Sequence, residues 1–120
     1  ADDTSKGSFG LPAILDIGAL RVAVSTNGLS PAYGARLRRE IAEIVPDYID
    51  EFLAYLGNAR ERSKQSIPDL QLRMRFNAYL ASDEGQFLFE SSDTKTAEAR
   101  VVELLAKPET IPELFTPKWG

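Results

Sequence analysis

The sequence contains no histidine and no cysteine among its 120 residues. These two absences exclude disulfides, thiolate metal sites, and catalysis that depends on a thiol or an imidazole. Any proton transfer by this chain must use carboxylates, hydroxyls or amines. The sequence also has no apolar run near the roughly 20 residues that a membrane-spanning helix needs, and no signal peptide opens it. We therefore expect a cytoplasmic protein with no membrane partner.

Positive charge is in deficit, because 14 lysines and arginines face 18 aspartates and glutamates, for a formal net charge of -4. An acidic chain gains little from releasing the counterions of a phosphate backbone, so we expect no nucleic-acid partner. The hydrophobic content is nevertheless 43%. A chain of this length and composition can bury about two thirds of its unfolded surface, which predicts a folded unit.

The stretch from Ala19 to Ile41 predicts a strand, a tight turn and a long helix in direct succession. Leu20, Val22 and Val24 alternate with other residues at the period of a strand that buries one face. The turn that follows is rich in hydroxyls and holds Asn27 and Gly28, which tolerate positive φ. Ser30 and the proline after it then give a helix N-cap followed by proline at the first helical position.

Two interpretations of this turn are open. In one, its hydroxyls and the N–H groups at the helix N-terminus form a pocket for an anion or a carboxylated ligand. In the other, the turn only reverses the chain and caps a helix. The local pattern alone favours the second interpretation.

Several short motifs, in this order and at these separations, resemble the siroheme synthase family. They are Asp2, Ser8-Phe9, Pro12-Ala13-Ile14, the run from Val22 to Gly28, Ser30-Pro31, and the run from Arg36 to Ile41. Members of the family are NAD-dependent precorrin-2 dehydrogenases that make sirohydrochlorin, and some are also sirohydrochlorin ferrochelatases that take Fe2+ as a substrate. The resemblance implies a homodimer formed through the hairpin and a tetrapyrrole polycarboxylate as the ligand. After Asp47 it is only a helical pattern.

Two departures from the family qualify what the resemblance implies. The family begins with a dinucleotide-binding domain that carries G-x-G-x-x-G, and this motif does not occur in the sequence. We therefore expect a later part of a longer enzyme, with NAD bound by a preceding domain and no dehydrogenase activity in these residues alone. The family also commonly has Gly-Gly where this chain has Asn27-Gly28. Asparagine accepts left-handed backbone, so the turn should persist.

The candidate site residues come from the resemblance and the turn together. The resemblance makes Asp2 the catalytic carboxylate, which would accept protons during dehydrogenation and chelation. It also implies that Thr26 stands where some members carry a phosphorylated serine. Guanidinium groups fork onto carboxylates, so arginines of the long helix are candidate ligand contacts. The predicted substrate-binding residues are Ser25, Thr26, Asn27, Gly28, Ser30, Arg36 and Arg39. A further basic stretch holds Arg60, Arg62, Arg73 and Arg75.

The fold class predicted is α+β, a short β-hairpin followed by a small bundle of four to five helices. A first strand is expected from Phe9 to Leu15, with a turn at Asp16-Ile17-Gly18. Helices are expected over about 30–45 and 47–63, from Ser66-Ile67-Pro68-Asp69 onward, after Ser82, and after Asp93 or Thr94. The boundaries predicted are 1–29 for the linker and dimerising hairpin, 30–106 for the tetrapyrrole-side helical domain, and 107–120 for a proline-rich tail whose Leu114, Phe115 and Trp119 dock on the helices. The alternative function is a non-catalytic, dimeric helical interaction module.

Overall fold

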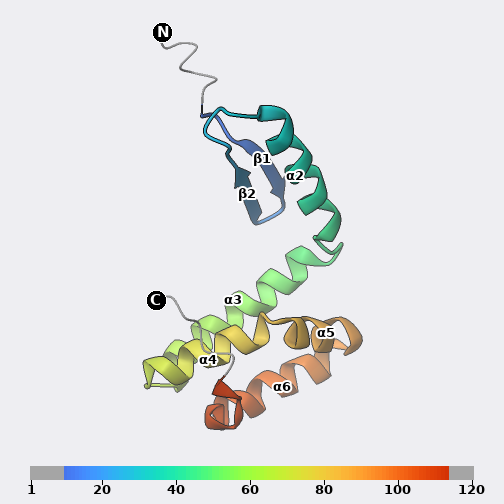
Figure 1. The fold of residues 1–120 in the computed structure, drawn as a ribbon. Coiled ribbons are helices and arrows are strands. Elements are labelled where there is room, and N and C mark those ends of the chain that lie inside the picture. The colour runs from blue at the N-terminus through green and yellow to red at the C-terminus, as the bar shows by residue number, and fades with distance from the viewer. Residues whose placement is uncertain (1–9, 114–120) are drawn as a thin grey trace. The chain divides into compact units, whose positions relative to one another are not determined.

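The computed structural model describes residues 10–113 and divides the chain into two compact units, Ala1–Glu51 and Phe52–Gly120. A β-hairpin precedes five α-helices and a short 3-10 helix, which confirms the predicted α+β class (Figure 1). The strands are β1 (Ala13–Ile17) and β2 (Leu20–Val24). The helices are α2 (Pro31–Ile44), α3 (Ile49–Ser66), α4 (Leu70–Leu80), α5 (Asp83–Ser91), α6 (Thr94–Ala106) and the 3-10 helix η1 (Pro108–Thr110).

The hairpin is antiparallel, and its register pairs Leu15 with Val22 and Ile17 with Leu20. Two residues, Gly18 and Ala19, join the strands, and Gly18 has a φ of 57°. Glycine at the first central position is the sequence that a type II′ turn requires. A side chain at Gly18 would also collide with Asp50, whose Oδ1 would lie 1.8 Å from the new Cβ. The same Oδ1 accepts the N–H of Ala19 at 3.2 Å, so Asp50 holds the hairpin end.

Helix α2 packs along both strands of the hairpin (Figure 1). The strand face that carries Leu15, Val22 and Val24 is buried or half-buried, while Arg21 and Ala23 on the other face are exposed. The predicted alternation of β2 is therefore confirmed. This helix therefore covers the inner face of the hairpin.

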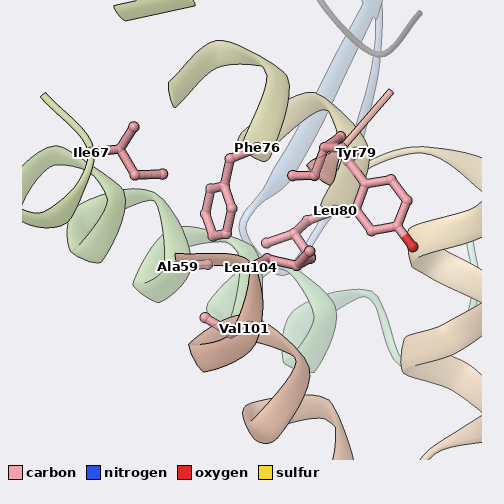
Figure 2. Close-up of a cluster of buried hydrophobic side chains, with 8 residues drawn as sticks. Ala59, Ile67, Phe76, Tyr79, Leu80, Val101 and Leu104 are labelled. Carbon is pink, nitrogen blue, oxygen red and sulfur yellow. The ribbon is translucent and has the colours of Figure 1, made fainter. Parts of the chain in front are cut away.

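The second unit is built around a cluster of apolar side chains from α3, α4, α6 and the segment after α6 (Figure 2). Phe76 at its centre is 0% exposed, and Ala59 and Val101 are each 1% exposed. Figure 2 shows Tyr79 with its ring near the cluster and its hydroxyl directed away from Phe76. That hydroxyl donates to Glu84 Oε2 at 2.9 Å, which satisfies its one polar group.

Several predicted boundaries need correction. Asp16 and Ile17 belong to β1, which begins at Ala13, because the tight turn is formed by the two residues after Ile17. Ser66 ends α3 and does not begin the next helix, because the N–H of Ile67 continues the helical pattern to the carbonyl of Ser63. Asp69 is the true N-cap of α4, and its side chain accepts the N–H of Leu72.

Ser30, Ser82 and Asp93 are confirmed as N-caps of α2, α5 and α6, while the helix predicted over 47–63 runs from Ile49 to Ser66. The segment after α6 is not simply extended, because Pro108 opens η1 and is buried, and Ile111 is 3% exposed in the core. The predicted docking of Leu114, Phe115 and Trp119 concerns residues outside the described range. Over 10–113, no helix has the length and apolar character that crossing a bilayer demands.

Candidate functional site

The turn between β2 and α2 has the backbone that its sequence predicts. Asn27 has a φ of 58° and Gly28 a φ of 79°, so two successive residues adopt the left-handed conformation. Two such residues turn the strand into the helix within a few positions. Ser30 then caps α2, and its Oγ accepts the N–H of Tyr33 at 3.1 Å.

Hydrogen bonds within the turn engage most of the groups proposed for ligand binding. Ser25 Oγ accepts the N–H of Asn27 at 3.2 Å, and Thr26 Oγ1 accepts the N–H of Ser30 at 3.0 Å. The N–H of Leu29 bonds to the carbonyl of Thr26 at 3.1 Å. The three hydroxyls therefore accept backbone hydrogen bonds, and each keeps its own hydrogen to donate. A ligand at this turn would be met by hydroxyl donors more than by free backbone N–H groups.

A cavity of about 260 Å³ lies between this turn and the start of β1, and residues of both line it. Leu11, Pro12, Ala13, Val24, Thr26, Gly28, Pro31 and Gly34 line it. Thr26 and Gly28 are therefore the predicted site residues that this cavity brings together. Gly34, which the sequence analysis did not select, is buried where α2 meets β2, and a Cβ there would lie 3.7 Å from the carbonyl oxygen of Val24. The sequence feature that could have identified Gly34 is a glycine inside a predicted helix, which often marks a close packing contact.

The two predicted ligand arginines of α2 are both exposed. Arg36 Nε donates to Glu40 Oε2 at 3.0 Å, and its guanidinium lies 5.6 Å from the centre of the Tyr33 ring. The hydrogen bond with Glu40, and then its charge, raise the pKa of Arg36. An exposed i,i+4 pair of this kind is weak and exchangeable, so Arg36 can leave Glu40 for a stronger carboxylate partner.

Other arginines, on α2 and between residues 60 and 75, bond to backbone carbonyls or to a carboxylate within their own unit. Arg38 donates from Nε to the carbonyl of Ile14 and fixes α2 against β1. Arg73 donates to the carbonyls of Ile67 and Pro68, and Arg75 to the carbonyl of Ile111. Arg62 pairs with Glu98 at 2.5 Å. These contacts favour the interpretation of the second basic stretch as part of the fold.

Asp2, the predicted catalytic carboxylate, lies outside the described residues. Within residues 10–113, no group of three or more histidine, cysteine, aspartate or glutamate side chains could hold a metal ion. The described part of the candidate site therefore offers hydroxyl donors, an apolar cavity beside the turn and two exposed guanidinium groups on the following helix. This arrangement suits a ligand with an apolar body and carboxylates at its edge.

The hairpin, the turn and α2 together form one α+β unit. The family model described as "Sirohaem biosynthesis protein central" matches residues 18–44, which comprise the end of the hairpin, the turn and α2. Siroheme synthase 2 of Cronobacter sakazakii is 32% identical over 110 residues, covering 89% of this chain and 24% of the relative. Siroheme synthase of Salmonella arizonae is 30% identical over 108 residues, covering 89% of this chain and 24% of the relative.

These comparisons support a fragment of a siroheme synthase family protein, because the chain is similar to siroheme synthases over about nine tenths of its own length. The chain spans about a quarter of the length of the curated relatives that it matches. The similarity extends across the helical unit, since the aligned stretches take in about nine tenths of the chain. This extends the resemblance well past Asp47, where the motifs had ended.

Proposed function

We propose that this chain is the dimerising and tetrapyrrole-binding part of a siroheme-biosynthesis enzyme. In the whole enzyme the reaction is oxidation of precorrin-2 to sirohydrochlorin by NAD, with iron insertion as a second activity, Fe2+ being a substrate. NAD is bound by residues outside this chain, because the 120 residues contain no G-x-G-x-x-G. The observation that carries the proposal is the coincidence of the matched segment, residues 18–44, with the second strand of the hairpin, the turn and α2.

The ligand chemistry supports a polycarboxylated tetrapyrrole at the turn. The cavity beside Thr26 and Gly28 is mostly apolar and suits one edge of a macrocycle, since about 260 Å³ is below the usual range for a whole drug-sized ligand. Ser25, Thr26 and Ser30 have hydroxyl hydrogens that can donate to acetate or propionate groups. Arg36 and Arg39 add positive charge one and two turns further along α2.

The hairpin supports dimerisation, because within residues 10–113 no further strand pairs with either outer edge of the two-stranded sheet. Large apolar side chains of the first unit are also exposed, including Leu29 at 87% and Ile44 at 78%. Exposed apolar side chains of this size lose contact with water when an interface covers them, which favours association. We propose that a second copy of the chain covers this surface.

Asp2 gives the proposal a chemical test in the full-length enzyme. Asparagine keeps the shape of the side chain but cannot take a proton, so Asp2→Asn should lower turnover of precorrin-2 by about a hundredfold or more. NAD affinity should be unchanged, and Asp3→Asn is the matched control that should remain active. Turnover is followed by the absorbance of NADH and sirohydrochlorin. Failure of the unmodified enzyme to oxidise precorrin-2 would overturn the proposed function, and an active Asp2→Asn enzyme would remove Asp2 from it.

A further inference from the structure

The helical unit contains a second cavity, of about 260 Å³, that belongs to neither the turn nor the hairpin. Its walls come from α3, α5 and α6, and they are largely apolar, with Tyr55, Leu88, Phe89 and Ala97 among the lining residues. The Tyr55 and Phe89 rings are tilted at 45° with their centres 4.8 Å apart, so they form one aromatic wall. Burial raises the pKa of Tyr55, which agrees with an apolar surrounding.

Two residues of opposite charge, Arg100 and Glu103, also line this cavity. Arg100 donates from one terminal nitrogen to the Tyr79 hydroxyl at 2.9 Å, and that hydroxyl donates onward to Glu84. Glu103 is 3.7 Å from the other terminal nitrogen, beyond hydrogen-bond distance, and its side chain is 68% exposed. The Tyr79 contact fixes one terminal nitrogen of Arg100, while the other is only loosely paired with Glu103.

The pairing of Arg100 within the described residues is incomplete. Its Nε is buried and has no hydrogen-bond partner among them. An unpaired buried donor is costly, and polar groups of this kind are usually satisfied in folded proteins. An apolar side chain of similar length would fill the same space without that cost. The Arg100 side chain as a whole is 41% exposed and carries a full charge, which makes it a candidate for pairing with an anion.

We propose that this cavity is a binding site for a small aromatic carboxylate, whose ring lies against Tyr55 and Phe89 and whose carboxylate pairs with Arg100. Ser92 and Thr96, which also line the cavity, provide hydroxyl donors for the second carboxylate oxygen. The volume excludes an entire tetrapyrrole and suits a single ring with a short acidic side chain. The proposal does not depend on the proposed function, because every residue that it uses lies in the helical unit.

The experiment compares two probes of nearly identical shape on the 120-residue chain. The probes are 3-phenylpropanoate and its neutral amide, titrated at pH 7 while amide chemical shifts are followed by NMR. The acid should bind at least about tenfold more tightly than the amide, because only the acid pairs with the guanidinium. The largest shifts should fall at Ala97 and Ala99, which both line the cavity.

Arg100→Met tests the charge while keeping an apolar side chain of similar reach. It should remove the preference for the acid and leave binding of the amide unchanged. Arg60→Met is the matched control, since Arg60 lies on α3 with its side chain 62% exposed. Equal binding of the two probes by the unmodified chain would overturn the proposal, even if Arg100→Met does not fold. Loss of the preference in the Arg60→Met chain, or shifts confined to residues outside the cavity, would also overturn it.

Discussion

At the scale of single residues, two helical glycines differ in what surrounds them. A Cβ at Gly85 would lie 2.3 Å from the carbonyl oxygen of Leu80 and 2.4 Å from that of Tyr79. Both are backbone atoms, so neither can move aside without shifting the end of α4. A Cβ at Gly57 would have nothing within 4 Å. The same substitution should therefore have opposite effects at the two positions.

We predict that Gly57→Ala stabilises the chain by about 0.5–1 kcal/mol, because alanine is the better helix former. Gly85→Ala should destabilise it by about 1–3 kcal/mol, since α4 and α5 must separate to admit the methyl group. Urea unfolding followed by circular dichroism measures both. A change of the same sign at the two positions would show that Gly85 is not in close contact with α4.

The arginines show where residue-level prediction from the sequence fails. A run of positive charge predicts a patch for anions, but it carries no information on which carbonyl oxygens will lie nearby in space. Arg38 and Arg73 each bond to backbone carbonyls, and Arg38 reaches one 24 positions away in the sequence. Arg100, by contrast, was not a candidate residue from the sequence, because the cavity that it lines forms only when α3, α5 and α6 pack together.

At the scale of elements, the starts of helices were predictable because their signals are local. Ser30, Ser82 and Asp93 each accept an N–H from the first turn of the helix that they precede. The start of α4 was misplaced because Ser66 and Asp69 both fit a capping pattern, and only Asp69 lies outside the preceding helix. The packing of α2 on the hairpin was not predictable, since nothing in a strand pattern says which element covers it.

We predict that Ser30→Ala lowers the stability of the first unit by about 1 kcal/mol, through loss of the bond to the N–H of Tyr33. Ser91→Ala is a suitable comparison, because Ser91 is exposed and ends a helix. Hydrogen exchange of the amides at the start of α2 measures the local effect. Unchanged exchange in the Ser30→Ala chain would mean that the cap contributes nothing there.

The cap of α6 should make stability depend on pH. The N–H of Thr96, and then its hydroxyl, hydrogen-bond to Asp93 and lower the pKa of that carboxyl in the folded chain. The unfolded chain therefore binds the proton first, and the contribution of Asp93 is present above pH of about 4 and lost as pH falls through the lowered pKa.

Asp93→Asn is the variant that isolates this contribution, because asparagine caps a helix nearly as well but does not titrate. We predict that the variant is less stable than the parent at pH 7 and that the gap narrows or closes near pH 2. Urea midpoints at the two pH values measure the gap. A gap that stays constant across this range would contradict the assigned role of Asp93.

At the scale of the whole molecule, the two-stranded hairpin and the exposed apolar residues of the first unit predict a dimer. Ala23 lies on the outward face of the hairpin and is exposed. We predict a dimer in sedimentation velocity and a shift toward monomer for Ala23→Glu, because a charge would be buried in the interface. Val102→Glu on α6, which is 52% exposed, should leave the dimer intact. A monodisperse monomer at high protein concentration would contradict the proposed interface.

Binding of a tetrapyrrole polycarboxylate by the first unit can be measured by equilibrium titration with sirohydrochlorin, followed by the visible absorption of the ligand. The variant Arg36→Gln with Arg39→Gln is compared with Arg60→Gln with Lys95→Gln, which removes the same charge from exposed positions of the helical unit. We predict that the first pair weakens binding by about tenfold or more, that the second pair changes it little, and that rising salt weakens binding by the parent chain. Equal effects of the two pairs, or affinity indifferent to salt, would contradict the proposed tetrapyrrole binding.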